Sequence, residues 1–210
     1  MISDYRCFFC VARAFEKLLE NENITSEAKS CFTRDMAELY YRVWGTSSAP
    51  EFSRELHNML ERYTQNHDPY KQAKRESNDL VMSMYDDLKK TISISQNPAE
   101  TALRLALAGN IIDFAAKSEY NLEDAIKNAL NSELSINHLE QLMEAIASAN
   151  LVLYLGDNAG EIVFDKLFIE TIKHPNLIYV VRGAPVINDA TMEDAEYTGM
   201  SSITKVISNE

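Results

Sequence analysis

The sequence has no long hydrophobic run, few basic residues and few cysteines, and each of these shortages narrows the possible functions. A membrane-spanning helix needs about 18 or more consecutive apolar residues, and no such run occurs in the 210 residues. The first residues, MISDYRCFFC, lack the basic-then-apolar layout of a secretory signal peptide. We therefore expect a cytoplasmic protein with no membrane partner.

Positive charge is scarce, because 20 Lys and Arg residues stand against 32 Asp and Glu residues, giving a formal net charge of −12. Nucleic-acid binding needs a basic surface for the phosphate backbone, so we expect no nucleic-acid partner. A small phosphorylated ligand remains compatible with this charge, since a bound metal ion and a few placed cations reverse the local sign. The sequence does not predict an oligomeric state.

Cys7, Cys10 and Cys31 are the only cysteines, and in a cytoplasmic chain we predict thiols rather than disulfides. Cys7 and Cys10 share one helix face. No second cysteine or histidine pair has the ligand spacing of a structural zinc site. Packing is the default role for this pair, and a redox or metal-binding role is the alternative.

Up to about residue 148 the apolar residues recur with helical periodicity. The longest predicted helix covers residues 69–92, with Asp68 as its N-cap and Pro69 in its first turn. We predict an all-α domain over residues 1–148. The other predicted helices cover residues 8–20 and 25–43, begin at residues 50 and 97, and cover residues 121–130 and 136–148.

After residue 150 the pattern changes to short, nearly all-apolar runs that alternate with helical segments. This alternation indicates a parallel sheet covered on both faces. The fold class is therefore α/β with an all-α N-terminal domain, and the α/β domain covers residues 149–210. The predicted strands are residues 151–155, 177–182 and 201–208, and the helices between them are residues 160–173 and 191–198.

A sheet of three strands that stops at Glu210 has little area and an unpaired edge. We therefore expect that a C-terminal portion is missing and that the α/β domain is incomplete.

Polar side chains follow the first strand at the point where Gly156 ends it. Asp157, Asn158 and Glu161 come next, on a turn that enters a helix. Parallel α/β sheets bind their ligands at such carboxyl ends of strands. A carboxylate beside an amide oxygen suits a hard cation such as magnesium.

A second polar cluster, RGAPVINDAT, follows the second strand at residues 182–191. Adjacent parallel strands lie about 5 Å apart, so we expect the two loops to face each other and Asp189 to join Asp157 and Asn158 around one cation. Arg182 and the amides around Gly183 are suited to bind a phosphate. The alternative is structural, since both segments also resemble strand-to-helix turns with N-caps.

Asn110 and Asp113 are three residues apart in the apolar segment LALAGNIIDFAA and share one helix face. Burying such a polar pair is costly unless it is paired or functional. The two alternatives are a functional pair and a hydrogen-bonded pair between helices.

Taken together, these segments resemble the damage-control phosphatases, a family of ARMT-like proteins formerly carried as a domain of unknown function. The resemblance runs from about residue 5 to the end of the chain, and the paired cysteines resemble the stand-alone microbial branch. The matching motifs are Cys7-x-x-Cys10, Asp68-Pro69-Tyr70-Lys71 with Lys74 and Asn78, residues 108–114, residues 156–161 and residues 182–191.

The resemblance implies a helical domain joined to a Rossmann-like α/β/α domain, with the active site between them. It implies a phosphatase that hydrolyses phosphate monoesters of sugars and other small metabolites with a divalent metal ion (magnesium, manganese, cobalt or nickel). Metal-activated water is the expected nucleophile. The expected metal ligands and catalytic residues are Asp157, Asn158 and Asp189. The expected substrate-binding residues are Glu161, Arg182, Gly183, Asn188, Asn110 and Asp113.

The resemblance also implies further strands past Glu210 and a loop whose lysine contacts phosphate. Without that portion we expect weak metal binding and slow or absent turnover. A haloacid-dehalogenase-like phosphatase is one alternative, but it needs an Asp where Ala159 stands. A nucleotide-cofactor domain would need a Gly-x-Gly turn at Gly156. The non-enzymatic alternative is a helical interaction module with a degenerate, truncated α/β domain.

Overall fold

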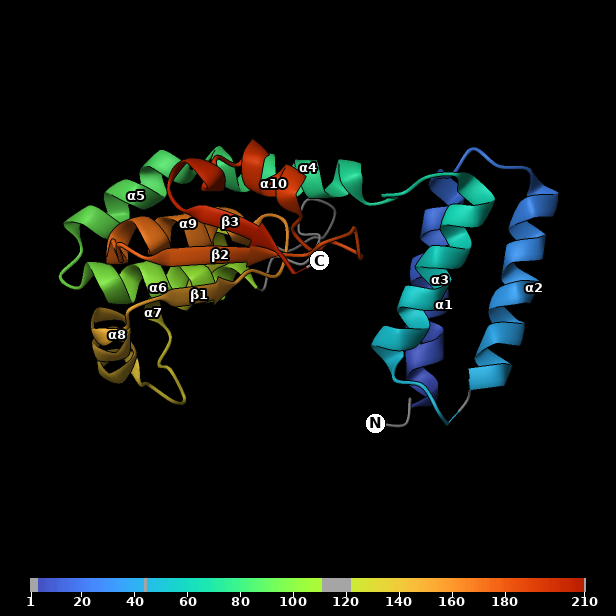
Figure 1. The fold of residues 1–210 in the computed structure, drawn as a ribbon, viewed down its shortest axis with the longest axis horizontal. Coiled ribbons are helices and arrows are strands. Elements are labelled where there is room, and N and C mark those ends of the chain that lie inside the picture. The colour runs from blue at the N-terminus through green and yellow to red at the C-terminus, as the bar shows by residue number, and fades with distance from the viewer. Residues whose placement is uncertain (1–3, 44, 111–121, 210) are drawn as a thin grey trace. The chain divides into compact units, whose positions relative to one another are not determined.

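The computed structural model describes residues 4–43, 45–110 and 122–209, and Figure 1 shows its ribbon. As predicted, a mostly helical N-terminal region is followed by a three-stranded parallel sheet with helices. The chain forms two compact units, Met1–Pro69 and Tyr70–Glu210. The domain boundary predicted at residues 148–149 falls inside the second unit and stays a prediction. Within the described residues, no helix is both long and apolar enough to span a bilayer.

In its described residues, the first unit contains three helices held together by their apolar faces. Phe15, Phe32 and Leu56 are buried, and the rings of Phe15 and Phe32 stack with their centroids 5.8 Å apart. Cys7 and Cys31 are half-buried and Cys10 is exposed. The three helices are α1 (Tyr5–Asn21), α2 (Ser26–Val43) and α3 (Ala49–Thr64).

The second unit contains the sheet, whose strands run parallel in the order β1-β2-β3. In the register of the sheet, Tyr154 lies beside Tyr179. The strands are β1 (Val152–Leu155), β2 (Leu177–Val181) and β3 (Lys205–Ser208). The helices before the sheet are α4 (Lys71–Met82), α5 (Tyr85–Ile94), α6 (Pro98–Gly109), α7 (Leu122–Asn131) and α8 (Leu139–Ser148). The helices that alternate with the strands are α9 (Glu161–Ile172), α10 (Met192–Tyr197) and the short 3-10 helix η2 (Met200–Ser202).

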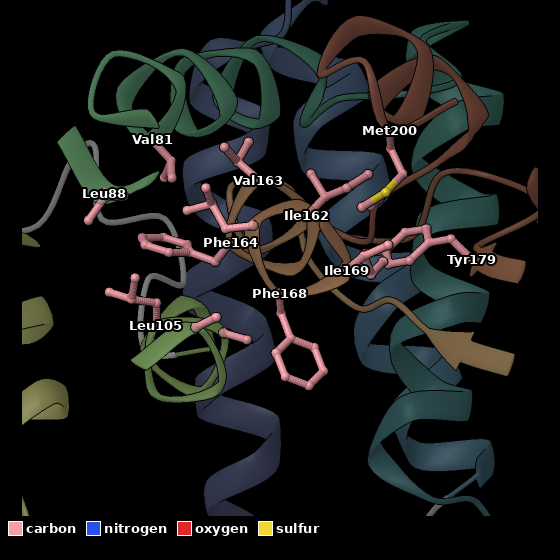
Figure 2. Packing of buried hydrophobic residues seen from close by; sticks show 14 of the residues in the cluster. Val81, Leu88, Leu105, Ile162, Val163, Phe164, Phe168, Ile169, Tyr179 and Met200 are labelled. Carbon is pink, nitrogen blue, oxygen red and sulfur yellow. The ribbon is translucent and has the colours of Figure 1, made fainter. Parts of the chain in front are cut away.

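Helix α9 is the centre of the second unit. Its sequence, EIVFDKLFIETI, is apolar on almost every side, as expected of a helix that is packed all around. Figure 2 shows Val81 of α4 and Leu105 of α6 near Phe164 of α9, and Tyr179 of β2 in the same cluster. Full burial of each large apolar side chain contributes about 1.5–3 kcal/mol. The turn that begins α9 is thereby fixed against α4, α6 and the sheet.

One face of the sheet is not covered by the described helices. Val152 and Tyr154 of β1 point toward the core, whereas Leu153 and Leu155 are 57% and 74% exposed. Alternation of this kind is expected where a strand buries one face only. The second helical layer of the α/β/α arrangement therefore stays a prediction.

Two predicted elements differ from the structure. The helix predicted over residues 69–92 is divided into α4 and α5, and at the break the Met84 N–H donates to the Val81 carbonyl (3.0 Å), a three-residue step in place of the four-residue step of an α-helix. A turn occupies residues 69–70, so the N-cap of α4 is Tyr70 and not Asp68. The strand predicted from residue 201 begins only at Lys205, after η2.

Candidate metal and phosphate site

The loops that follow β1 and β2 are joined by backbone hydrogen bonds. The Ala159 N–H donates to the Asn188 carbonyl (2.8 Å), and the Ala190 N–H donates to the Asp157 carbonyl (2.7 Å). These bonds make Asn158 and Asp189 partners in an isolated antiparallel bridge. The structure therefore brings together the two loops that the sequence predicted to face each other.

Asn158 is held by the first residue of α9. Its amide nitrogen Nδ2 donates to Oε2 of Glu161 (3.2 Å), and Glu161 is buried. Because the amide nitrogen of Asn158 points toward the Glu161 carboxylate, its amide oxygen Oδ1 points away from Glu161. Burial raises the pKa of the Glu161 carboxyl, and the nearby Asp157 raises it further. Glu161 thus orients the Asn158 amide oxygen.

Asp189 is paired with Arg182. The guanidinium Nε of Arg182 donates to Oδ2 of Asp189 (2.6 Å), and the Asp189 side chain is the more buried of the two. Burial raises the pKa of Asp189, and the Arg182 hydrogen bond works in the opposite direction. The charge of Asp157 also raises the Asp189 pKa, and that of Lys74 lowers it.

The predicted metal ligands provide oxygen donors of the type that hard divalent cations prefer. Asp157 is exposed at the end of β1, and Asn158 and Asp189 are half-buried. Among the described residues, no group of three or more His, Cys, Asp or Glu side chains converges on a common point. The set is two carboxylates and one amide oxygen, a sparse oxygen set of the kind magnesium completes with water.

The remaining predicted site residues lie around these loops with different partners. The Gly183 N–H donates to Oδ1 of Asn209 (3.0 Å), and Asn188 is buried. Asn110 is exposed at the C-cap of α6. Its neighbour Gly109 packs so closely on α9 that a Cβ there would lie 3.1 Å from Cγ of Glu161. Asp113 lies outside the described residues.

A buried carboxylate beneath the first loop was not found from the sequence. Asp165 of α9 accepts hydrogen bonds from the hydroxyls of Tyr154 (2.6 Å) and Tyr179 (2.7 Å). The Tyr179 ring lies against Gly156, where a Cβ would be 2.2 Å from the tyrosine oxygen. Gly156 is therefore required by this close approach. Asp165 is hard to identify from the sequence. It stands alone in an apolar helix, and its hydrogen-bond partners Tyr154 and Tyr179 are 11 and 14 residues away.

Helix α4 also contributes to the site. Asn78 contacts the loop after β1 at Gly160, and both Asn78 and Lys74 contact Asp194 of α10. The sequence assigns Lys74 and Asn78 to the family motif but does not identify Asp194 as their partner. The signal that could have found it is Thr191-x-x-Asp194, a capping box that opens α10.

Residues 3–210 match the family described as the damage-control phosphatase ARMT1-like domain. An uncharacterized protein of Methanocaldococcus jannaschii is 33% identical over 213 residues, which cover 96% of this chain and 69% of the relative. A damage-control phosphatase of Pyrococcus horikoshii is 29% identical over 97% of this chain and 72% of the relative. A damage-control phosphatase of Archaeoglobus fulgidus is 35% identical over 65% of this chain and 49% of the relative.

The fold is shared with a solved structure. The crystal structure of a DUF89 family protein from Pyrococcus horikoshii resembles the chain with a TM-score of 0.83 at 27% sequence identity. The match covers 99% of this chain and 74% of that chain. The predicted order of a helical region followed by an α/β region is therefore common to both proteins.

Proposed function

Because the chain belongs to the damage-control phosphatase ARMT1-like domain family, as its motifs predicted, we propose that it hydrolyses phosphate monoesters of small metabolites. In this proposal Asp157, Asn158 and Asp189 hold a divalent metal ion. Sugar phosphates and damaged phosphometabolites are the proposed substrates, and magnesium, manganese, cobalt or nickel is the proposed metal. Two relatives carry the name damage-control phosphatase.

The observation that supports this proposal most directly is the backbone pairing of the two loops. Asn158 and Asp189 are bridge partners, and the Asp157 carbonyl takes part in the same pairing. Two loops joined in this way present their polar side chains on one edge of the sheet, where parallel α/β folds bind ligands. A pair of unrelated helix caps would not require the loops to be joined to each other.

The surrounding side chains suit a phosphate dianion. When bound, the metal ion supplies a Lewis acid that neutralises charge on the phosphoryl oxygens and activates water. Arg182 uses Nε for Asp189, and its two terminal nitrogens are the kind of donors that bind phosphate oxygens. The N-terminus of α9 adds the positive end of a helix dipole at Glu161.

The proposal is tested with a phosphatase assay on p-nitrophenyl phosphate and a panel of sugar phosphates, with manganese or cobalt added. Asp157→Ala and Asp189→Ala are each expected to reduce kcat/KM at least 100-fold, because each removes a charged ligand of the proposed ion. Asp86→Ala is the matched control, since Asp86 is an exposed carboxylate on α5, and it should retain wild-type activity.

Circular dichroism should show the same helix content in all three variants, because Asp157 is exposed and Asp189 lies in a loop. Retained turnover in Asp157→Ala or Asp189→Ala would remove that residue from the proposed ligand set. The assay uses the full-length protein, and full-length wild type that binds a metal ion but hydrolyses none of the phosphate monoesters would contradict the proposed reaction.

A further inference from the structure

One side chain of α4 connects the two loops of the candidate site. Asn78 has no exposed surface, and both ends of its amide are engaged. Its Oδ1 accepts the Gly160 N–H (2.7 Å), and its Nδ2 donates to Oδ1 of Asp194 (3.0 Å). An amide is the one short side chain that presents an acceptor and a donor side by side, so it matches both partners.

Asp194 carries the connection into the second loop. Its Oδ2 accepts hydrogen bonds from the Thr191 N–H (2.9 Å) and the Thr191 hydroxyl (2.8 Å). The same oxygen pairs with Nζ of Lys74 (3.3 Å), whose side chain is 3% exposed. Lys74 is thus a buried cation of α4 that holds the start of α10.

Each end of this network lies next to a proposed metal ligand in the sequence. Gly160 follows Asn158 by two positions, and Thr191 follows Asp189 by two positions. Gly160 has a positive φ of 85°, and a Cβ there would lie 3.3 Å from Cβ of Ser77. The loop therefore packs closely against α4. Moving α4 would therefore move both loops.

We infer that Asn78, supported by Lys74 and Asp194, is a positioning residue that fixes the spacing between the two metal-binding loops. The part of this inference that concerns the metal rests on the proposed function. A buried ion pair such as Lys74–Asp194 contributes little net stability, because desolvation offsets the attraction between the charges. Its role is to fix one arrangement of the loops.

Asn78→Ala tests the inference by removing both hydrogen bonds of the amide. Hydrogen exchange of the metal-free protein should be at least 10-fold faster at the amides of residues 158–160 and 189–191. The Mn²⁺ dissociation constant from isothermal titration calorimetry should rise at least 10-fold. Val81→Ala is the matched control, because Val81 is buried on the same helix but lies in the apolar core. It should lower the melting temperature without changing either quantity.

The exchanged pair Asn78→Asp with Asp194→Asn provides a rescue that does not depend on the alanine variant folding. Asn78→Asp alone places two carboxylates in contact and should loosen both loops. The double variant restores a donor–acceptor pair and should return exchange and Mn²⁺ affinity to within about threefold of wild type.

Unchanged loop exchange in Asn78→Ala, or equal effects in Val81→Ala, would overturn the inference, as would a double variant no better than Asn78→Asp. Hydrogen exchange of the loops could become faster in Asn78→Ala as expected while the wild-type protein binds no Mn²⁺. In that case the positioning role of Asn78 is supported and the proposed function is contradicted. The exchange measurement needs no metal, so the two failures are distinguishable.

Discussion

Gly156 lies where the first strand ends and the candidate site begins. A Cβ at this position would lie 2.2 Å from the hydroxyl oxygen and 2.4 Å from Cζ of Tyr179. Tyr179 cannot move easily, because it is fully buried and its hydroxyl is bonded to Asp165. The backbone that leads to Asp157 is therefore packed directly on a fixed aromatic ring.

Gly156→Ala should destabilise the protein by roughly 3 kcal/mol, the upper end of the usual cost of overpacking a core. Gly45→Ala is the control, because a Cβ there meets nothing within 4 Å and only the positive φ of 77° opposes it. That strain costs about 1 kcal/mol. Urea unfolding measures both free energies. Equal losses in the two variants would show that Tyr179 does not constrain Gly156.

The sequence identified Gly156 as the end of a strand but could not reveal its contact with Tyr179. That contact depends on the register of β1 on β2, which places Tyr154 beside Tyr179. The same limit applies to Asp194, whose partners Lys74 and Asn78 are more than a hundred residues away in the sequence. Asp157 and Asn158 could be selected because they come just after the first apolar strand, and Asp189 because it lies in the polar segment that follows the second. Their metal-binding role remains a prediction.

At the scale of elements, Asp165 connects α9 to both β1 and β2 through Tyr154 and Tyr179. The carboxyl is fully buried, and burial raises its pKa from 3.8 to about 7, although both tyrosine hydrogen bonds lower it. The folded protein thus holds this proton to a higher pH than the unfolded chain does. The stabilisation that results is fully present below about pH 4 and is lost as the pH rises through about 7.

Asp165→Asn removes this titration while keeping the shape of the side chain. Between pH 4 and pH 8, the free energy of unfolding of the wild type should fall relative to that of the variant by a few kcal/mol, on the order of 1.4 kcal/mol for each pKa unit. Urea unfolding in metal-free buffer at several pH values measures the difference. Parallel stability curves for the two proteins would mean that Asp165 titrates alike in the folded and unfolded states.

Most of the elements could be predicted from periodicity, and the errors have local causes. The strands were nearly all apolar, and α9 followed the first of them with its polar turn, so β1, β2 and α9 were found. The break between α4 and α5 is not predicted from the sequence, because neither Ser83 nor Met84 is a glycine or a proline. Helical periodicity alone does not report a change from a four-residue to a three-residue hydrogen-bond step.

For the molecule as a whole, the division into two compact units at Pro69 and Tyr70 leaves the boundary predicted at residues 148–149 inside the second unit, where it stays a prediction. The prediction placed all the early helices in one domain because they share one periodicity. The structure packs α6 against α9, with Leu105 of α6 in the same core as Phe164 of α9 (Figure 2). Periodicity identifies a helix but not the partner against which its apolar face packs.

Leu56→Ala and Leu105→Ala form a matched pair that tests this division, because both leucines are fully buried, one in each unit. Each substitution should cost about 2–5 kcal/mol. Hydrogen exchange should accelerate in α1–α3 for Leu56→Ala, and in α9 and β1 for Leu105→Ala. If Leu105→Ala instead opened α1–α3 and left α9 protected, the boundary predicted at residues 148–149 would be the better description.

We propose that the two loops, whose residues Asn158 and Asp189 are bridge partners, hold one divalent cation between Asp157, Asn158 and Asp189. Crystals soaked in Mn²⁺ and measured at the manganese absorption edge test it most directly. We expect a single strong anomalous peak within bonding distance of an oxygen from each of the three side chains, and no such peak in Asp189→Ala crystals. A manganese ion bound elsewhere, or an equal peak in the variant, would show that these three side chains do not form the metal site.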